Sequence, residues 1–433
     1  MKEDWIEVEL GKVCSINMGQ SPPSATYNKD GDGMPFFQGK AEFTELHPVV
    51  KKWCTAPKKT AKKGDVLISV RAPVGSTNIA NIDCAIGRGL AAITYRFGYK
   101  YIWYFLRQIE RRLDDQGTGT TFKAISGSIL KSQKIPLAPL PEQRAIVAKI
   151  EQLFSELDNG IANLKAAKDK LEIYRQAVLK KAFEGELTKE WRNGLNHDSK
   201  DSDDNLDSKS RNQGHPKNQG SEIGKLPRGW KWMKFKDVTN IISGKNQKQV
   251  DNPKGKFPIY GSGGIFGRAN DYLCEPGTTI IGRKGTINSP IFVNERFWNV
   301  DTAFGISPMN NLVPKFLFYF CLRFNFKKLD KSTTIPSLAK RDLLQIDFPL
   351  SSQEEQKQIV HEIESRLSIC DNILANIEEG LKKSEALRQS ILKQAFEGKL
   401  LSEEEVEACR AAPDWEPAEQ LLERIKNQKE GTA

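Results

Sequence analysis

The sequence predicts an α+β protein in which two mixed α/β domains are each followed by one long helix. Three observations support this class: an internal repeat, a helical periodicity confined to that repeat, and short β-rich runs in the blocks that precede it. A chain of 433 residues is long enough for two or three domains, each with its own core. The repeat is taken first because it determines the architecture.

The repeat relates two segments that lie 213 positions apart. Residues 142–187 align with residues 355–400 without a gap, and 22 of the 46 aligned positions are identical. The two copies end on nearly the same phrase, KKAFEGEL and KQAFEGKL. At the same offset TTFKAISGSILKSQKIPL matches TTIPSLAKRDLLQIDFPL, and the start around Trp5 resembles the start around Trp230. The chain is therefore predicted to be a tandem of domain plus helix.

Within each copy of the repeat, apolar residues recur in steps of three, four and seven, which predicts a helix. Each copy is about 40 residues long, or roughly 60 Å as a helix. A stripe of this period is buried against the other helix or against a partner, as in a coiled coil. Pro141 gives a start signal, and Gly185 and Gly398 give stop signals. The residues predicted to form this seam or to dock a partner are Ile146, Ile150, Leu153, Leu157, Leu164, Leu171, Val178, Phe183, Ile359, Ile363, Leu367, Ile377, Leu381, Ile391 and Phe396.

The blocks before the helices contain short β-rich runs at 65–70, 278–282 and 289–293, with helical stretches at 101–113 and 314–329. Gly, Pro and Asn separate these runs, which predicts mixed α/β domains. Residues 193–224 are polar and nearly free of large apolar residues, so they should be a flexible linker. The predicted organisation is a first domain at 1–141, a central helix at 142–190, a linker at 191–226, a second domain at 227–354, a distal helix at 355–401, and a tail with one short helix at 402–433.

Positive charge is concentrated in the two domain blocks. Residues 1–141 hold 20 Lys and Arg against 13 Asp and Glu, and residues 227–350 hold 19 against 9. Residues 142–226 balance at 15 against 15, whereas residues 351–433 hold 11 against 18. A single charge run is often only solvated surface, but two matched basic blocks favour a polyanionic partner, most simply double-stranded DNA.

Cysteine use and hydropathy indicate the compartment. The seven cysteines are scattered singly, without CxxC spacing or a nearby histidine cluster, which is typical of a reducing compartment and argues against structural zinc. The start MKEDWIEVEL has no apolar run after a basic segment, and no window approaches the roughly 20 apolar residues of a membrane span. We therefore expect a cytoplasmic protein with no membrane partner.

Motifs of the common enzyme classes are missing from the sequence. GMPFFQGKA lacks the Ser or Thr that follows Lys in a phosphate-binding loop, and GSGGIFG misses the dinucleotide-binding spacing by one residue and is typical of a turn. There is no HExxH, no Asn-Pro-Pro-aromatic loop of an amino-methyltransferase and no convincing acidic cluster for a nuclease metal. No catalytic residue, metal or cofactor is expected on this chain.

Several glycine-flanked stretches place cations beside hydrogen-bonding side chains. In the major groove Arg or Lys reads guanine and Asn or Gln reads adenine, whereas Lys, Ser and Thr mostly hold phosphates. Arg71, Arg283 and Gln247 are the preferred base readers, and for each the alternative is an ordinary surface side chain or one paired inside the fold. The candidate DNA-contacting residues are Arg71, Asn78, Thr118, Thr120, Thr121, Lys123, Lys245, Gln247, Lys248, Arg283, Lys284, Asn288, Thr333, Thr334, Lys340 and Arg341.

The phrases PLPEQRAIVAKIEQLF, YRQAVLKKAFEGELTKEWR, KLPRGWKW and QLLERIKNQK resemble segments of the specificity subunits of Type I restriction-modification systems. The resemblance covers essentially the whole chain in the family's order. It implies two target recognition domains that each read half of a split DNA sequence, and two helices that pack as an antiparallel coiled coil with pseudo-twofold symmetry. The first domain departs from the family, because it lacks the LPxGW lead that stands at 226–230.

The resemblance also implies partners. Two modification subunits would carry S-adenosylmethionine and methylate adenine, and restriction subunits would carry ATP, magnesium and the cleavage activity. Two other function classes remain open from the residues alone. One is a methyltransferase or nuclease with an unrecognised catalytic motif, and the other is a coiled-coil interaction protein without a DNA function, which leaves the two basic blocks unexplained.

Overall fold

A computed structural model describes residues 2–119, 123–197 and 226–430. The chain divides into two compact units, one formed by Met1–Leu164 with Glu379–Ala433 and the other by Lys165–Glu378. Each unit therefore contains one α/β domain, the start of the helix that follows it and the end of the other helix. The prediction of two mixed α/β domains, each followed by a long helix, is confirmed.

The domain of the first unit is built on a four-stranded antiparallel sheet of order β2-β10-β7-β8. A second sheet has the order β3-β5-β4-β9-β6, and β1 pairs with β11 where the domain meets its helix. The strands are β1 (Ile6–Glu9), β2 (Ser15–Met18), β3 (Tyr27–Asn28), β4 (Met34–Phe37), β5 (Trp53–Cys54), β6 (Thr60–Ala61), β7 (Val66–Ser69), β8 (Thr77–Ile79), β9 (Cys84–Ile86), β10 (Leu90–Thr94) and β11 (Lys134–Leu137). The helices are α1 (Leu10–Val13), α2 (Tyr99–Gln108), α3 (Glu110–Asp115) and α4 (Gly127–Lys131).

The domain of the second unit repeats this plan. Its four-stranded sheet has the equivalent order β13-β19-β16-β17, and β12 pairs with β20 as β1 pairs with β11. Its other sheet, of order β15-β14-β18, is smaller. The strands are β12 (Lys231–Lys234), β13 (Thr239–Ser243), β14 (Phe257–Gly261), β15 (Gly264–Ala269), β16 (Thr278–Gly282), β17 (Ile291–Val293), β18 (Trp298–Asn299), β19 (Ala303–Pro308) and β20 (Asp347–Leu350). The helices are α7 (Phe235–Val238), α8 (Pro314–Arg323) and α9 (Lys340–Leu343).

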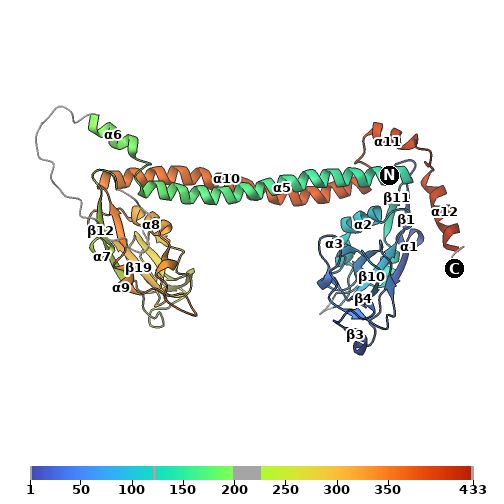
Figure 1. Cartoon of the computed structure of the whole chain (residues 1–433), viewed down its shortest axis with the longest axis horizontal. Helices are drawn as coiled ribbons and strands as arrows, with labels where there is room; N and C mark the ends of the chain where they lie inside the picture. Colours follow the sequence, from blue (N-terminus) through green and yellow to red (C-terminus); the bar gives the residue numbers. More distant parts are fainter. Residues whose placement is uncertain (1, 120–122, 198–225, 431–433) are drawn as a thin grey trace, which may run out of the picture. The chain divides into compact units, whose positions relative to one another are not determined.

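The two long helices are α5 (Leu140–Phe183) and α10 (Gln353–Phe396), and in each unit they lie side by side (Figure 1). In the second unit Arg175 pairs with Asp371 and Lys168 with Glu378, so residue numbers fall along one helix as they rise along the other. The helices are therefore antiparallel. All fifteen residues of the predicted seam are buried or half-buried. Tyr174 and Leu387, which follow the same periodicity, are 44% and 49% exposed.

Each long helix ends in the core of the domain that it does not follow. Phe183, at the end of α5, is fully buried in the second unit and its ring lies 4.9 Å from that of Phe316 on α8. Phe396, at the end of α10, is buried in the first unit and its ring lies 5.2 Å from that of Tyr101 on α2. The repeated phrase, KAFEGEL and QAFEGKL, is thus the part of each long helix that packs into the core of the other helix's domain.

Two predicted segments differ from the structure in detail. α6 (Lys189–His197) occupies the start of the predicted linker 191–226. Arg192 of α6 pairs with Glu355 of α10, and this contact holds a helix where the polar composition predicts a flexible linker. The remainder, 198–225, lies outside the described residues. The tail forms α11 (Glu403–Arg410) as well as the expected helix, α12 (Ala418–Glu430), because Ser402 caps α11 and hydrogen-bonds the amide N of Glu405.

Candidate nucleic-acid interface

Each domain carries a turn after its central strand, β7 or β16, and a loop that is hydrogen-bonded to that turn. In the first domain the backbone of Arg71 forms an isolated antiparallel β-bridge with that of Ala124. On either side of it, the amide N of Ala72 donates to the Lys123 carbonyl O (2.9 Å), and the amide N of Ile125 donates to the Val70 carbonyl O (3.0 Å). We call this surface the turn–loop junction. Its hydrogen bonds fix the backbone, so the side chains of the turn extend from a rigid base.

The second domain has the same junction at an offset of 213 residues throughout. The backbone of Lys284 forms an isolated antiparallel β-bridge with that of Ser337. The amide N of Gly285 donates to the Pro336 carbonyl O (2.9 Å), and the amide N of Leu338 donates to the Arg283 carbonyl O (2.9 Å). Lys284 therefore takes the place of Arg71, and Arg283 takes the place of Val70.

In the first domain the junction brings three of the predicted DNA-contacting residues together. Arg71, Thr118 and Lys123 are exposed, and Thr118 also bridges Ala124. The Lys123 ammonium lies 2.8 Å from the Asp114 carboxylate, which raises the pKa of Lys123 and lowers the pKa of Asp114. Lys123 is therefore a charged contact that Asp114 orients. The predicted residues Thr120 and Thr121 lie outside the described residues.

Asn78 does not lie on this surface. Its side chain is fully buried, and its amide donates to the Thr44 carbonyl O at 2.9 Å. The Asn78 Oδ1 in turn accepts from the Thr44 amide N at 3.4 Å. Asn78 therefore anchors the 44–49 loop against β8, and its chemistry is used inside the domain. Asn78 was a predicted DNA contact because it lies in a glycine-flanked stretch with Arg71 and because Asn reads adenine in the major groove.

Arg283 and Lys284 differ in their freedom to meet DNA. The Arg283 guanidinium lies over the Phe304 ring at 5.8 Å and donates to the Asp301 carbonyl O at 3.4 Å, and the residue is half-buried. Lys284 is exposed. Arg71 and Arg283 are both predicted base readers, but the residue equivalent to Arg71 is Lys284, as the offset of 213 residues shows directly.

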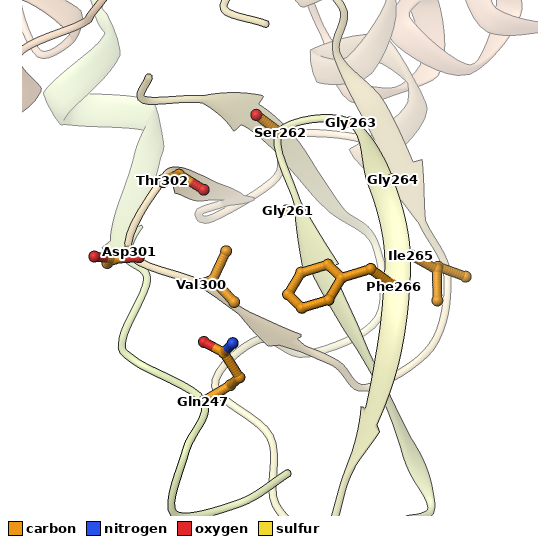
Figure 2. Close-up of a pocket in the computed structure, with 10 residues that line it drawn as sticks. All are labelled: Gln247, Gly261, Ser262, Gly263, Gly264, Ile265, Phe266, Val300, Asp301 and Thr302. Atoms are coloured by element: carbon orange, nitrogen blue, oxygen red, sulfur yellow. The ribbon is translucent and has the colours of Figure 1, made fainter. Parts of the chain in front are cut away.

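A hollow of about 460 Å³ lies next to the junction of the second domain. It is lined by Gln247 and by residues of the β14–β15 hairpin and of the turn before β19 (Figure 2). The amide N of Arg283 donates to the Thr302 carbonyl O (2.7 Å), so the hollow and the junction share one wall. The lining residues that were not among the predicted DNA contacts include Ser262, Ile265, Phe266, Val300, Asp301 and Thr302. GSGGIFG marked this place, but its glycines indicated only a turn.

The other predicted contacts of the second domain are exposed at the surface, and some are held by the fold. The Lys340 ammonium donates to the Ile241 carbonyl O at 2.6 Å, and Asn288 Oδ1 accepts from the Phe326 amide N at 2.7 Å. Lys245, Lys248, Thr333, Thr334 and Arg341 are exposed, and the Arg341 side chain is 83% exposed.

Nucleophile and metal chemistry receive no support from the described residues. All seven cysteines are buried free thiols, and burial raises the pKa of Cys84 and of Cys274 to about 12. Within 2–119, 123–197 and 226–430, no group of His, Cys, Asp and Glu is arranged to hold a metal ion. No helix among these residues is long and apolar enough to cross a membrane.

Comparison with known proteins gives consistent relatives. The putative type I restriction enzyme MjaX specificity subunit of Methanocaldococcus jannaschii is 41% identical over 190 residues, which are 43% of this chain and 44% of that protein. The type I restriction enzyme EcoDI specificity subunit of Escherichia coli is 24% identical over 462 residues, covering 98% of this chain and 95% of that protein. A solved structure on complex assembly and conformational transition of the type I R-M system contains a chain with the same fold, with a TM-score of 0.70 at 22% identity over 92% of this chain and 99% of that chain.

The Type I restriction modification DNA specificity domain matches this chain twice, at residues 2–166 and 227–383. Each match covers one α/β domain and the beginning of the long helix that follows it. This match confirms the prediction that the chain is a DNA specificity subunit with two recognition domains rather than a catalytic subunit. The chain belongs to the Type I restriction modification DNA specificity family.

Proposed function

We propose that each domain of this chain reads one half of a split DNA target through its turn–loop junction. The observation that carries the proposal is the equivalence of Arg71 and Lys284, two exposed cations on the same hydrogen-bonded turn of two different domains. Two copies of one framework with different side chains suit two half-sites of different sequence. The basic excess of both domain blocks supplies the attraction to phosphate.

The helix pair is proposed to set the gap between the half-sites and to seat partner subunits. α5 and α10 are each continuous over 44 residues, and each has its end buried in the other helix's domain. Two modification subunits would use two similar docking surfaces, which explains a doubled helix sequence. S-adenosylmethionine, ATP and magnesium would be bound by the modification and restriction subunits, which supply methyl transfer and cleavage.

The test is to map methylated adenines in the host genome and to repeat the methylation with the purified chain plus its modification subunits. We expect one bipartite motif with a fixed gap, methylated only when the chain is present. Methyl transfer by the chain alone, or binding of S-adenosylmethionine to it in equilibrium dialysis, would favour the enzyme alternative and overturn the proposal.

Salt dependence separates DNA reading from a purely structural coiled-coil role. The assembled complex should lose DNA affinity steeply between about 50 and 200 mM salt, because neutralised phosphates release counterions. Retention that does not respond to salt, or no retention of DNA by the complex, would favour an interaction protein without a DNA function.

A further inference from the structure

The β14–β15 hairpin of the second domain exposes two adjacent apolar side chains. Ile265 is 59% exposed and Phe266 is 58% exposed. Neighbouring residues of a strand point to opposite faces, so neither face of β15 buries its large side chain here. β15 is also at the edge of its sheet, where charged residues are usual.

Phe266 and Ile265 are both among the residues that line the hollow described above, but their side chains lie on opposite sides of β15 (Figure 2). Figure 2 shows the Phe266 ring directed toward Val300, with Gln247 on the same side and Ile265 on the other. Gly264 has φ +119°, a conformation that favours glycine, and it allows the hairpin to turn without a side chain over the hollow. The result is an open hollow with an aromatic wall and an amide at its edge.

The polar groups of the hollow suit a base edge better than a phosphate. Among the described residues no hydrogen-bond partner holds the Gln247 side-chain amide, and a free amide offers one donor and one acceptor side by side. Asp301 also lines the hollow, and its carboxylate repels phosphate. Lys245, Lys248 and Lys284 are exposed around it and suit the flanking phosphates.

The hairpin belongs to the second domain only, within the part of the chain that the structure describes. β4 and β14 are equivalent. β4 pairs in parallel with β9, which directly precedes β10 of the four-stranded sheet, and β14 pairs in parallel with β18, which directly precedes β19. On its other side β4 pairs with β5, the next strand along the chain, after a longer connection over 38–52, whereas β14 pairs with β15 through a tight glycine turn. A feature that the shared framework lacks is where two half-sites can be told apart.

We propose that this hollow reads an A·T base pair of the second half-site in the major groove, an inference that rests on the proposed function. Gln247 would pair with N6 and N7 of adenine, and Phe266 would contact the 5-methyl group of thymine, which are the contacts that these side chains favour. The combination selects A·T because a G·C pair offers neither the N6 donor of adenine nor the 5-methyl group of thymine.

The test uses the full chain assembled with its modification subunits, on the target mapped for that complex. At each thymine of the second half-site, uracil replaces thymine and removes only the methyl group. At one of these positions the uracil substitution should weaken wild-type binding by about fourfold, which is the effect of removing one buried methyl group. Phe266→Ala should abolish that penalty, whereas the matched control Ile265→Ala should retain it.

A second probe addresses Gln247 independently. Replacing adenine by 7-deazaadenine at the same base pair removes the N7 acceptor, and it should weaken the wild-type complex but not Gln247→Ala. Phe266 is exposed and Gln247 is half-buried at the edge of the hollow, so the variants should fold, which circular dichroism of the complex checks. Specific binding without any uracil penalty that depends on Phe266 would overturn the inference and leave the proposed function standing.

Two other outcomes would also overturn it. A Phe266→Ala complex that loses affinity equally for all DNA would make Phe266 a general packing contact. A Phe266→Ala chain that no longer binds its modification subunits would make the hollow a protein-docking surface. Absence of any sequence-specific binding by the wild-type complex would instead remove the proposed function itself, and the inference with it.

Discussion

Trp5 donates its indole N–H to Oε2 of Glu142 at 2.9 Å, and both side chains are buried. Trp230 and Glu355 form the same bond at 2.8 Å in the second unit. Each bond joins the first strand region of a domain to the first turn of its long helix. A buried carboxylate needs such a donor, so these pairs fix where each helix leaves its domain.

Replacing either tryptophan with phenylalanine should destabilise its own unit. Trp5→Phe leaves a buried charged acceptor without its donor, which should lower the free energy of unfolding by about 1.5–3 kcal/mol. Amide hydrogen exchange, read separately in the two units, measures the effect. Trp230→Phe is the corresponding variant of the second unit, and its effect should be smaller because Thr188 and Arg192 still donate to Glu355. Equal loss of protection in both units from either substitution would contradict a local role for the bond.

A substitution at the buried end of a long helix should destabilise the domain that this helix does not follow. Phe183→Ala should lower the free energy of unfolding of the second unit, and Phe396→Ala that of the first, by about 3–5 kcal/mol each. Each aromatic ring fills the core of the domain that its helix does not follow. Ile173→Ala is the control, because Ile173 is 70% exposed on α5 and its change should stay within about 0.5 kcal/mol. Loss of protection in the domain that precedes the mutated helix would show that the ends are not exchanged.

The equivalence of Arg71 and Lys284 predicts half-site effects that do not cross. Arg71→Ala should relax selection at one half-site, by about 1–3 kcal/mol at the base that it contacts, and leave the other unchanged. Lys284→Ala should act on the other half-site. Arg71→Lys keeps the charge but loses the planar fork, so it separates base reading from phosphate contact. Binding selections on randomised half-sites report all three variants. Uniform weakening on every DNA by Arg71→Ala, with recovery in Arg71→Lys, would assign Arg71 to phosphate.

The spacer role predicts a change of gap without a change of half-site. Inserting four residues into both α5 and α10, at facing positions, adds about 6 Å to each helix, or about two base pairs of DNA. Methylation mapping of the variant complex should show both original half-sites at a longer separation. Substituting four residues at the same positions without insertion is the control. An unchanged gap in the insertion variant would remove the spacer role from the helices.

The sequence predicted much of the fold because the signals involved are local or repeated. Apolar steps of three, four and seven are a property of one helix, so both long helices could be predicted without any tertiary contact. The predicted seam also included Phe183 and Phe396, which lie in the domain cores instead. The candidate site was harder to predict from sequence. Arg71, Lys123 and Lys284 were placed correctly on the surface, whereas Asn78 was not, because burial depends on which loop packs over a strand.

By itself the sequence determined the two-domain tandem, the helices and the basic character of the domains, since composition and periodicity are carried by neighbouring residues. Tertiary structure decided which domain each helix end completes, which cation matches Arg71, and that Gln247 and Phe266 share one hollow. These relationships join residues that are far apart along the chain. They depend on how the chain returns on itself, through hydrogen bonds and packing that no local pattern contains.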